Sequence, residues 1–348
     1  MDKPLISIIV PVYNVAPYVE DCIRSVMRQT YEGKMECIIV DDCGTDDSMA
    51  IVERIIEDYN GPISFKILHH THNRGLSAAR NTGMNAAIGD YLFFLDSDDE
   101  LTDDCFEKLT KPLETEWYDV VVGNILCFEM LPSNQKKRKS SAQELKIKED
   151  TLLYQPDLLQ THRKIWGQAS WNKLYRITLI RQKNLSFKEG LLHEDNLWSF
   201  QIACLASSLY CVNSVTYKYV NKRKGGITFY ETNQEISDNL IIIIKEMSLF
   251  VDNNHINVID VYSFFNNFFN KVLNANSTSL SIYVKTYKQV RANVRVSLKG
   301  MLQANQYNFK KCLHDFHYLF PMSIAPYWQY YIYFRLRPLI KKNEKKNN

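Results

Sequence analysis

The first third of the chain alternates short apolar runs with stretches of helical periodicity. Five apolar runs predict buried strands, over residues 5–10, 37–40, 64–68, 91–95 and 119–125. Between them, apolar residues recur three or four positions apart, as in Val19, Cys22, Ile23 and Val26, which predicts intervening helices. Strands alternating with helices favour an α/β fold, with a Rossmann-like, mostly parallel sheet flanked by helices.

The pattern changes further along the chain. Residues 133–141 are polar and contain four consecutive basic residues, which predicts a solvated loop, and residues 151–228 have mixed character. From residue 233 onward the spacing is mostly helical. We therefore expect an α/β domain over residues 1–230 and a helical C-terminal extension over residues 231–348.

Composition narrows the functional classes. The 348 residues are 45% hydrophobic, enough for a core without stabilising metals, and the net charge of +3 does not indicate a nucleic-acid partner. The eight cysteines form no C-x-x-C pair, so we expect no zinc site and a reducing compartment. No signal peptide is predicted, and no apolar run reaches the roughly 18 residues of a membrane span, so we expect a cytoplasmic protein.

Polar clusters follow three of the predicted strands, over residues 11–14, 41–42 and 96–99. The carboxyl ends of parallel strands meet at one edge of a sheet, so these clusters are expected to converge on one crevice. In the third cluster, Asp96, Asp98 and Asp99 crowd three carboxylates together, which favours a divalent cation such as Mg²⁺ or Mn²⁺. Alternatively, one or two of these acids cap a helix.

Four ordered segments of the chain resemble the signatures of glycosyltransferase family 2. They are Ile8-Ile9-Val10-Pro11-Val12-Tyr13-Asn14, residues 38–48 around Asp41-Asp42, residues 73–83 around Asn73-Arg74-Gly75, and residues 89–99 with their Asp96-Ser97-Asp98 element. The resemblance covers residues 5 to about 230. It implies a GT-A fold and an inverting enzyme, with a nucleotide-sugar binding half over residues 1–125 and an acceptor half over 126–230.

The resemblance also implies roles for individual residues on the donor side. It places Pro11, Val12 and Tyr13 along the nucleotide base, Asp42 as acceptor of a hydrogen bond from uracil, Asp96 on the ribose and Asp98 on the metal, Mn²⁺ or Mg²⁺. Asn73, Arg74, Gly75 and Arg80 correspond to the donor-binding loop, and Arg223 to a late loop that closes over the diphosphate. A helix-surface salt bridge is the alternative role of Arg80. Cys43-Gly44 departs from the family's usual Gly-Ser pair, which affects the detail of the base pocket.

A fifth segment, residues 191–198, is similar to the acceptor-side ED motif of the family. Asp195 matches its general base and Glu194 is its companion. An acid in the first turn of a helix is the alternative interpretation, and both can hold together. Trp171 offers a flat face on which an acceptor sugar could stack, with core packing as the alternative.

These features predict metal-dependent, inverting transfer of a sugar from a nucleotide-sugar, a UDP-sugar in particular, to an acceptor hydroxyl. The expected pathway is bacterial surface polysaccharide synthesis, with a glycan or lipid-linked glycan as acceptor. A nucleotidyltransferase and a non-catalytic nucleotide-sugar binding module are the alternatives. The aromatic and then basic segment 327–346 suggests peripheral contact with the inner face of the cytoplasmic membrane. Alternatively, its aromatic side packs on the catalytic domain and the lysine tail is solvated.

Overall fold

The protein divides into two compact units, Met1–Tyr230 and Glu231–Asn348, and each is described by itself. In this computed structural model, the structure describes residues 2–130, 136–139, 147–161, 166–221, 232–276, 279–294 and 296–332.

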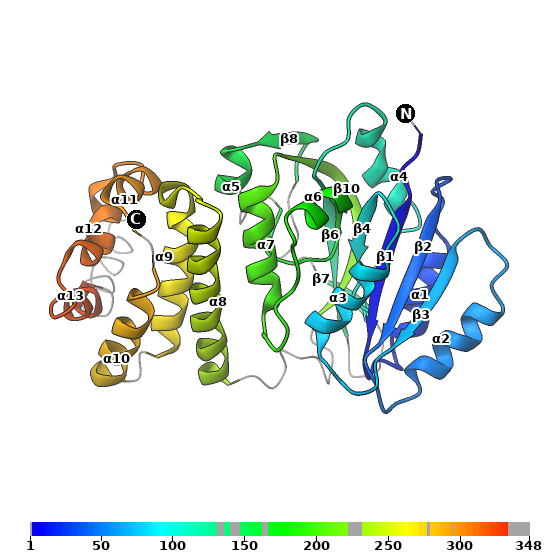
Figure 1. Ribbon diagram of the computed structural model, residues 1–348, viewed down its shortest axis with the longest axis horizontal. Coiled ribbons are helices and arrows are strands. Elements are labelled where there is room, and N and C mark those ends of the chain that lie inside the picture. The colour runs from blue at the N-terminus through cyan, green and yellow to red at the C-terminus, as the bar shows by residue number, and fades with distance from the viewer. Residues whose placement is uncertain are drawn as a thin grey trace. The chain divides into compact units, whose positions relative to one another are not determined.

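The first unit is built on a mixed sheet whose N-terminal half is parallel (Figure 1). Its strands are β1 (Ile6–Val12), β2 (Met35–Asp41), β3 (Ser64–His69) and β4 (Tyr91–Phe94), in the spatial order β3-β2-β1-β4. All three pairings are parallel. The α/β fold and the first four predicted strands are thus confirmed.

Helices cover both faces of this parallel half. They are α1 (Val19–Met27), α2 (Ser48–Glu57) and α3 (Leu76–Ala86). Alternate residues of a strand point to opposite faces, so Ile8 joins the core that contains α1, whereas Ile9 faces α3. A Cβ at Gly83 of α3 would lie 2.4 Å from the side chain of Ile9, so this helix approaches the sheet closely because it carries glycine there.

Beyond β4 the sheet changes direction. The strand β9 (Lys173–Arg176) lies antiparallel between β4 and β6 (Val120–Met130), and β6 pairs in parallel with β10 (Ser208–Asn221). The short strands β5 (Glu100–Leu101), β7 (Lys136–Lys139) and β8 (Thr151–Tyr154) add antiparallel pairings. The parallel pairing expected from the sequence therefore covers β1 to β4 and the β6–β10 pair, whereas the other pairings of the second half are antiparallel. Residues 136–139, predicted as loop, pair with β6 instead.

The remaining helical segments of the first unit connect these strands. They are α4 (Cys105–Thr110), η1 (Lys111–Glu114), α5 (Asp157–Thr161), α6 (Ile177–Gln182) and α7 (Glu194–Leu205).

The second unit is helical throughout its described residues. Its elements are α8 (Asn233–Asn253), α9 (Val258–Ala275), α10 (Leu280–Arg291), α11 (Leu298–Ala304), α12 (Phe309–Asp315), η3 (Phe316–Leu319) and α13 (Ala325–Tyr331). Side-chain caps start several of them, and Thr232 and Glu235 form a reciprocal capping box at α8. Among the helices that the structure describes, none combines the length and apolarity needed to cross a membrane.

Candidate functional site

The polar clusters expected to converge lie where β1, β2 and β4 end. The backbone N–H of Asp42, directly after β2, donates to the Val12 carbonyl at the end of β1 over 2.9 Å. Pro11 and Val12 are buried in this strand, whereas Tyr13 just beyond it is half exposed. The polar clusters therefore meet at the carboxyl edge of the sheet, where α/β proteins bind ligands.

Asp42 organises the turn that carries the third motif. Its Oδ1 accepts the backbone N–H of Arg74 and its Oδ2 that of Gly75, each at 2.8 Å. His70 Nδ1 lies 2.6 Å from the same Oδ1, and Nε2 of that ring lies 2.9 Å from the Thr82 hydroxyl oxygen. Gly75 adopts φ +86°, which side chains rarely adopt. The buried carboxylate thus ties the 70–75 segment to β2, and a contact with uracil would use its remaining lone pairs.

Three carboxylates gather after β4. Asp96, Asp98 and Asp99 each offer a carboxylate oxygen, and these oxygens all lie within 4.8 Å of one another. Burial, together with the charges of Asp98 and Asp96, raises the pKa of Asp99 well above its usual value. Such a set of hard oxygen ligands fits Mg²⁺ or Mn²⁺, which would offset the mutual repulsion.

Tyr217 of β10 holds Asp99, one member of this cluster, by a hydrogen bond. Its hydroxyl donates to Asp99 Oδ2 over 2.8 Å, and the backbone N–H of Val220 donates to Asp99 Oδ1 over the same distance. The Trp171 ring stacks on Tyr217 with centroids 4.7 Å apart and on Tyr219 at 5.2 Å. The packing alternative for Trp171 is therefore supported by contacts, and sugar stacking by this ring remains a prediction.

Arg80 joins the acidic cluster to the acceptor-side motif. Its Nη2 donates to Asp96 Oδ1 over 2.8 Å, and its Nη1 donates to Glu194 Oε1 over 2.6 Å and to Asp195 Oδ1 over 3.0 Å. The residue is only 1% exposed. It is therefore neither a surface ion pair nor a guanidinium open to solvent.

Asp195 lies in the first turn of α7, which begins at Glu194. The positive end of the helix dipole favours acids at this position. The Asp195 side chain is 25% exposed, against 10% for Glu194. Burial and the Asp195 charge raise the pKa of Glu194 to about 7, although Arg80 opposes them. Of the two acids, Asp195 is the more exposed.

Residues 7–182, about half of the chain, match the family model described as Glycosyl transferase family 2. The chain belongs to glycosyl transferase family 2. The family predicted from the four motifs is confirmed.

Curated relatives of this family 2 chain include bacterial glycosyltransferases. Glycosyltransferase GlyA of Streptococcus pneumoniae is 33% identical over 233 residues, which cover 64% of this chain and 31% of GlyA. The uncharacterized glycosyltransferase EpsJ of Bacillus subtilis is 36% identical over 193 residues, 54% of this chain and 52% of EpsJ. The chain thus spans about a third of the length of the first relative and about half of the second.

Solved structures of another glycosyltransferase share the fold. Staphylococcus aureus TarS residues 1–349 in complex with UDP aligns with a TM-score of 0.63 at 18% identity, covering 95% of this chain and 91% of that one. The same TarS segment in complex with UDP-GlcNAc aligns with a TM-score of 0.60. At this identity the likeness shows the GT-A fold alone.

The structure describes the other residues expected on the donor side to different extents. Arg223 lies outside the described residues. The Arg74 guanidinium is at the surface, where its Nη2 lies 3.1 Å from Glu189 Oε1, and Asn73 is exposed. The backbone N–H of Arg74, rather than its side chain, contacts Asp42.

Lys173 is a buried lysine two positions after Trp171, and the sequence pattern does not predict its burial. Lys173 Nζ donates to the Ala169 carbonyl over 2.6 Å. Burial lowers the pKa of Lys173 to about 7, while the Asp195 charge acts to raise it. Its burial follows from the place of β9 in the sheet, where Lys173 lies opposite Val122 of β6, and this pairing is not visible in the local sequence.

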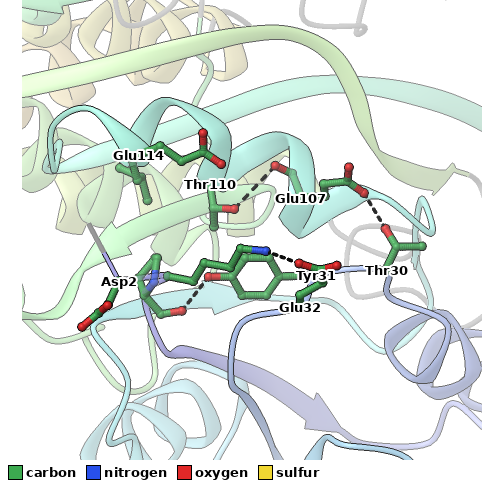
Figure 2. A pocket seen from close by; sticks show the side chains of 10 residues that line it. Asp2, Thr30, Tyr31, Glu32, Glu107, Thr110 and Glu114 are labelled. Carbon is green, nitrogen blue, oxygen red and sulfur yellow. Dashed lines mark hydrogen bonds and ion pairs between the residues drawn. The ribbon is translucent and has the colours of Figure 1, made fainter.

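A pocket of about 240 Å³ lies at the opposite end of β1 (Figure 2). Asp2, Lys3 and Pro4 line it before the strand begins, together with Thr30, Tyr31, Glu32, Glu107, Thr110, Leu113 and Glu114. Lys3 is paired with Glu32 at 2.6 Å, and the Tyr31 hydroxyl donates to the Pro4 carbonyl over 2.7 Å. The many carboxylates of this lining do not favour a diphosphate, so the nucleotide-sugar is not expected here.

Proposed function

We propose that this protein transfers a sugar from a UDP-sugar to an acceptor hydroxyl, with divalent metal assistance and inversion at the anomeric carbon. The observation that carries the proposal is the link through Arg80. One buried guanidinium contacts both Asp96 of the acidic cluster and Asp195 of the acceptor motif. An acidic cluster for the leaving group and a base for the acceptor thus lie within one small site.

The donor side would be prepared by the carboxylates after β4. Asp98, with Asp96 and Asp99 beside it, would hold Mn²⁺ or Mg²⁺, and Tyr217 keeps Asp99 oriented. The bound ion would neutralise charge that develops on the departing diphosphate. Asp96 would contact the ribose, and Asp42 with the Pro11–Tyr13 segment would hold the base.

Asp195 would serve as the general base. Its carboxylate takes the proton of the acceptor hydroxyl, whose oxygen forms a bond to the anomeric carbon. The bond from that carbon to the diphosphate oxygen breaks on the opposite face, and its electrons leave with UDP. A single displacement inverts the anomeric configuration and requires no covalent enzyme intermediate. A positioned base typically contributes about 10²- to 10⁴-fold in rate.

The two alternatives differ from this proposal at Asp195. A nucleotidyltransferase would not need the Glu194–Asp195 pair, and a non-catalytic binding module would not release nucleotide. The buried ion pairs of Arg80 with Glu194 and Asp195 support an intact acceptor site. Release of UDP from a UDP-sugar, only when an acceptor is supplied, would exclude both alternatives.

We expect UDP to bind more tightly than GDP, and UDP-sugars to be the donors turned over. The reason is the proposed role of Asp42, in which a remaining lone pair of its carboxylate would accept the N–H of uracil. TarS, one of the structural neighbours, was solved with UDP and with UDP-GlcNAc. Calorimetric titration of both nucleotides, followed by a nucleotide-release screen over UDP- and GDP-sugars, tests this. Tighter binding of GDP would overturn the base assignment and leave the transfer proposal standing.

For the acceptor we propose a glycan or lipid-linked glycan of a bacterial surface polysaccharide, met on the cytoplasmic side. The support is the set of bacterial glycosyltransferases that the chain resembles. We expect the acceptor on the cytoplasmic side because no apolar run of the sequence reaches the roughly 18 residues of a membrane span. A lipid-linked acceptor would favour an enzyme held at the membrane surface.

We further propose that the end of the helical unit contacts the inner membrane face. The two sides of α13 differ: Ala325, Pro326 and Gln329 are buried. Exposed apolar side chains gather on its other side and just before it, namely Leu319, Met322, Ile324, Tyr327 and Tyr331. One side of the segment therefore packs within the helical unit, where Gln329 forms hydrogen bonds with Tyr283 and Asn270, and the exposed apolar side chains support the proposed membrane contact.

Charge selects an anionic lipid surface as the partner of this apolar patch. From Phe316 to Asn343 the sequence contains no Asp or Glu, and six basic residues follow the aromatic segment, namely Arg335, Arg337, Lys341, Lys342, Lys345 and Lys346. These six lie outside the described residues. Basic residues near an anionic membrane contribute about 1 kcal/mol each, and apolar side chains add to this by inserting between headgroups.

A double variant, Ile324→Ser with Tyr327→Ser, is expected to bind vesicles of phosphatidylglycerol and phosphatidylcholine at least about tenfold more weakly. Full burial of one such side chain contributes roughly 1.5–3 kcal/mol, so two exceed the 1.4 kcal/mol of a tenfold change. Sedimentation with these vesicles, and with phosphatidylcholine alone, measures the effect. The matched control replaces Tyr307 and Phe309, which are exposed at 68% and 72% in the same unit. Equal binding by parent and double variant would contradict the proposal, and would leave a protein partner for this patch.

A further inference from the structure

We propose that Arg80 is a positioning residue that sets the geometry between the leaving-group side and the base, and that it does not bind the donor diphosphate. This inference rests on the proposed transfer reaction and assigns a role within that same site. It differs from the role that the family resemblance implies, in which Arg80 belongs to the donor-binding loop.

A diphosphate has little access to the Arg80 guanidinium. The residue is 1% exposed, and its two Nη atoms donate to carboxylates on two other elements, Asp96 after β4 and the Glu194–Asp195 pair at the start of α7. A diphosphate would have to displace these charge-assisted hydrogen bonds to reach the guanidinium. Arg80 instead links Asp96 to Glu194 and Asp195 through buried hydrogen bonds. We call this set of contacts the bridge.

Aromatic rings also hold the Arg80 guanidinium in place. The Arg80 Cζ lies 5.2 Å from the Phe187 ring centroid and 6.0 Å from that of Phe94, so two aromatic rings hold the guanidinium from its sides. Trp198 of α7 stacks on Phe187 with centroids 4.3 Å apart and meets Phe94 edge-on. The helix that carries Asp195 therefore packs on the same aromatic group that confines Arg80.

The positive charge of Arg80 also balances the carboxylates around it. Asp96, Glu194 and Asp195 would repel one another without a cation between them, and Arg80 is the cation that contacts all three. The guanidinium spreads its donors over a rigid plane, whereas a lysine ammonium is a single point. Lysine at this position would keep the charge but not all three contacts, and Asp195 would lose its fixed position.

The test is Arg80→Lys, with Arg181→Lys as matched control. Arg181 lies in the same unit, and its Nη2 donates to the Ala87 carbonyl directly after α3, away from the acids. We expect kcat to fall about 100-fold in Arg80→Lys, the effect typical of a catalytic group displaced by about 1 Å. The control should retain parental kcat.

Nucleotide binding separates positioning from phosphate contact. In titrations with a chelator present, a lost diphosphate contact weakens UDP but not uridine, whereas a shift of Asp96, which is placed on the ribose, weakens both equally. We therefore expect the ratio of the uridine and UDP dissociation constants to stay within about threefold of the parental ratio, well below the tenfold change that 1.4 kcal/mol represents. A collapse of this ratio, or a kcat within threefold of the parent in a folded variant, would overturn the proposal.

Two further measurements cover other failures. If Arg80→Lys does not fold, the charge-balanced double variant Arg80→Gln with Glu194→Gln replaces the buried pair by amides and should show the same kcat loss and the same unchanged ratio. If the parent turns over no donor, the transfer proposal fails. The bridge is then still tested by a double-mutant cycle on Tm, where Arg80→Lys and Asp195→Ala together should cost less than the sum of the two single losses. Strict additivity would contradict the bridge.

Discussion

Asp195→Asn is expected to bind UDP with nearly parental affinity and to lose about 10²- to 10⁴-fold in transfer rate, the usual contribution of a positioned base. The amide keeps the shape of the side chain and can still accept the hydrogen bond that Arg80 donates to Asp195 Oδ1. Its nitrogen and oxygen cannot take the acceptor proton. Chemistry should therefore suffer far more than binding.

Calorimetric titration with UDP, paired with a nucleotide-release assay, measures both properties of this variant. The matched control is Asp260→Asn, which also removes an acid from the first turn of a helix, in this case α9 of the second unit. It accounts for the helix-dipole contribution and should leave transfer unchanged. A transfer rate within tenfold of the parent would reject Asp195 as the base.

Asp98→Ala is expected to abolish metal-dependent turnover, with a loss of at least about 10²- to 10³-fold, as when one main electrostatic contact to a transition state is removed. The fold should persist, because the substitution removes one of three mutually repelling carboxylates. The variant should also lose any gain in UDP affinity that Mn²⁺ gives the parent.

Turnover and UDP titration, each with Mn²⁺, with Mg²⁺ and with a chelator, check this result. Asp103→Ala serves as control, since that acid is five residues away and 58% exposed, and it pairs only with Arg28 in a surface contact among the interactions described. Near-parental activity of Asp98→Ala with either ion would contradict the metal assignment.

Much of the first unit is predictable from local pattern. Strands β1 to β4 are short apolar runs bounded by polar residues, and their alternation with helices implies the parallel pairings. The second half of the sheet was not predictable in the same way. The apolar residues of β9 do not encode its antiparallel position between β4 and β6, which depends on how the chain returns to the sheet.

The site divides along the same line. Asp96, Asp98 and Asp195 stand in short motifs, so their chemistry could be proposed from the sequence. The hydrogen bond from Tyr217 to Asp99 spans 118 positions, and nothing near Tyr217 in the sequence signals it. His70 likewise contacts Asp42 only because β2 and β3 lie side by side.

By itself, the sequence determined the family, the α/β class, the acidic cluster and the acid pair at the start of a helix, because each is written in neighbouring residues or in a short repeat of apolar positions. Only the tertiary structure decided which residues Arg80 contacts. Its position in α3 allowed a surface ion pair or a donor contact equally. Its partners Glu194 and Asp195 lie 114 and 115 positions away. A guanidinium is buried only where folding brings enough carboxylates around it, and that condition depends on the path of the whole chain.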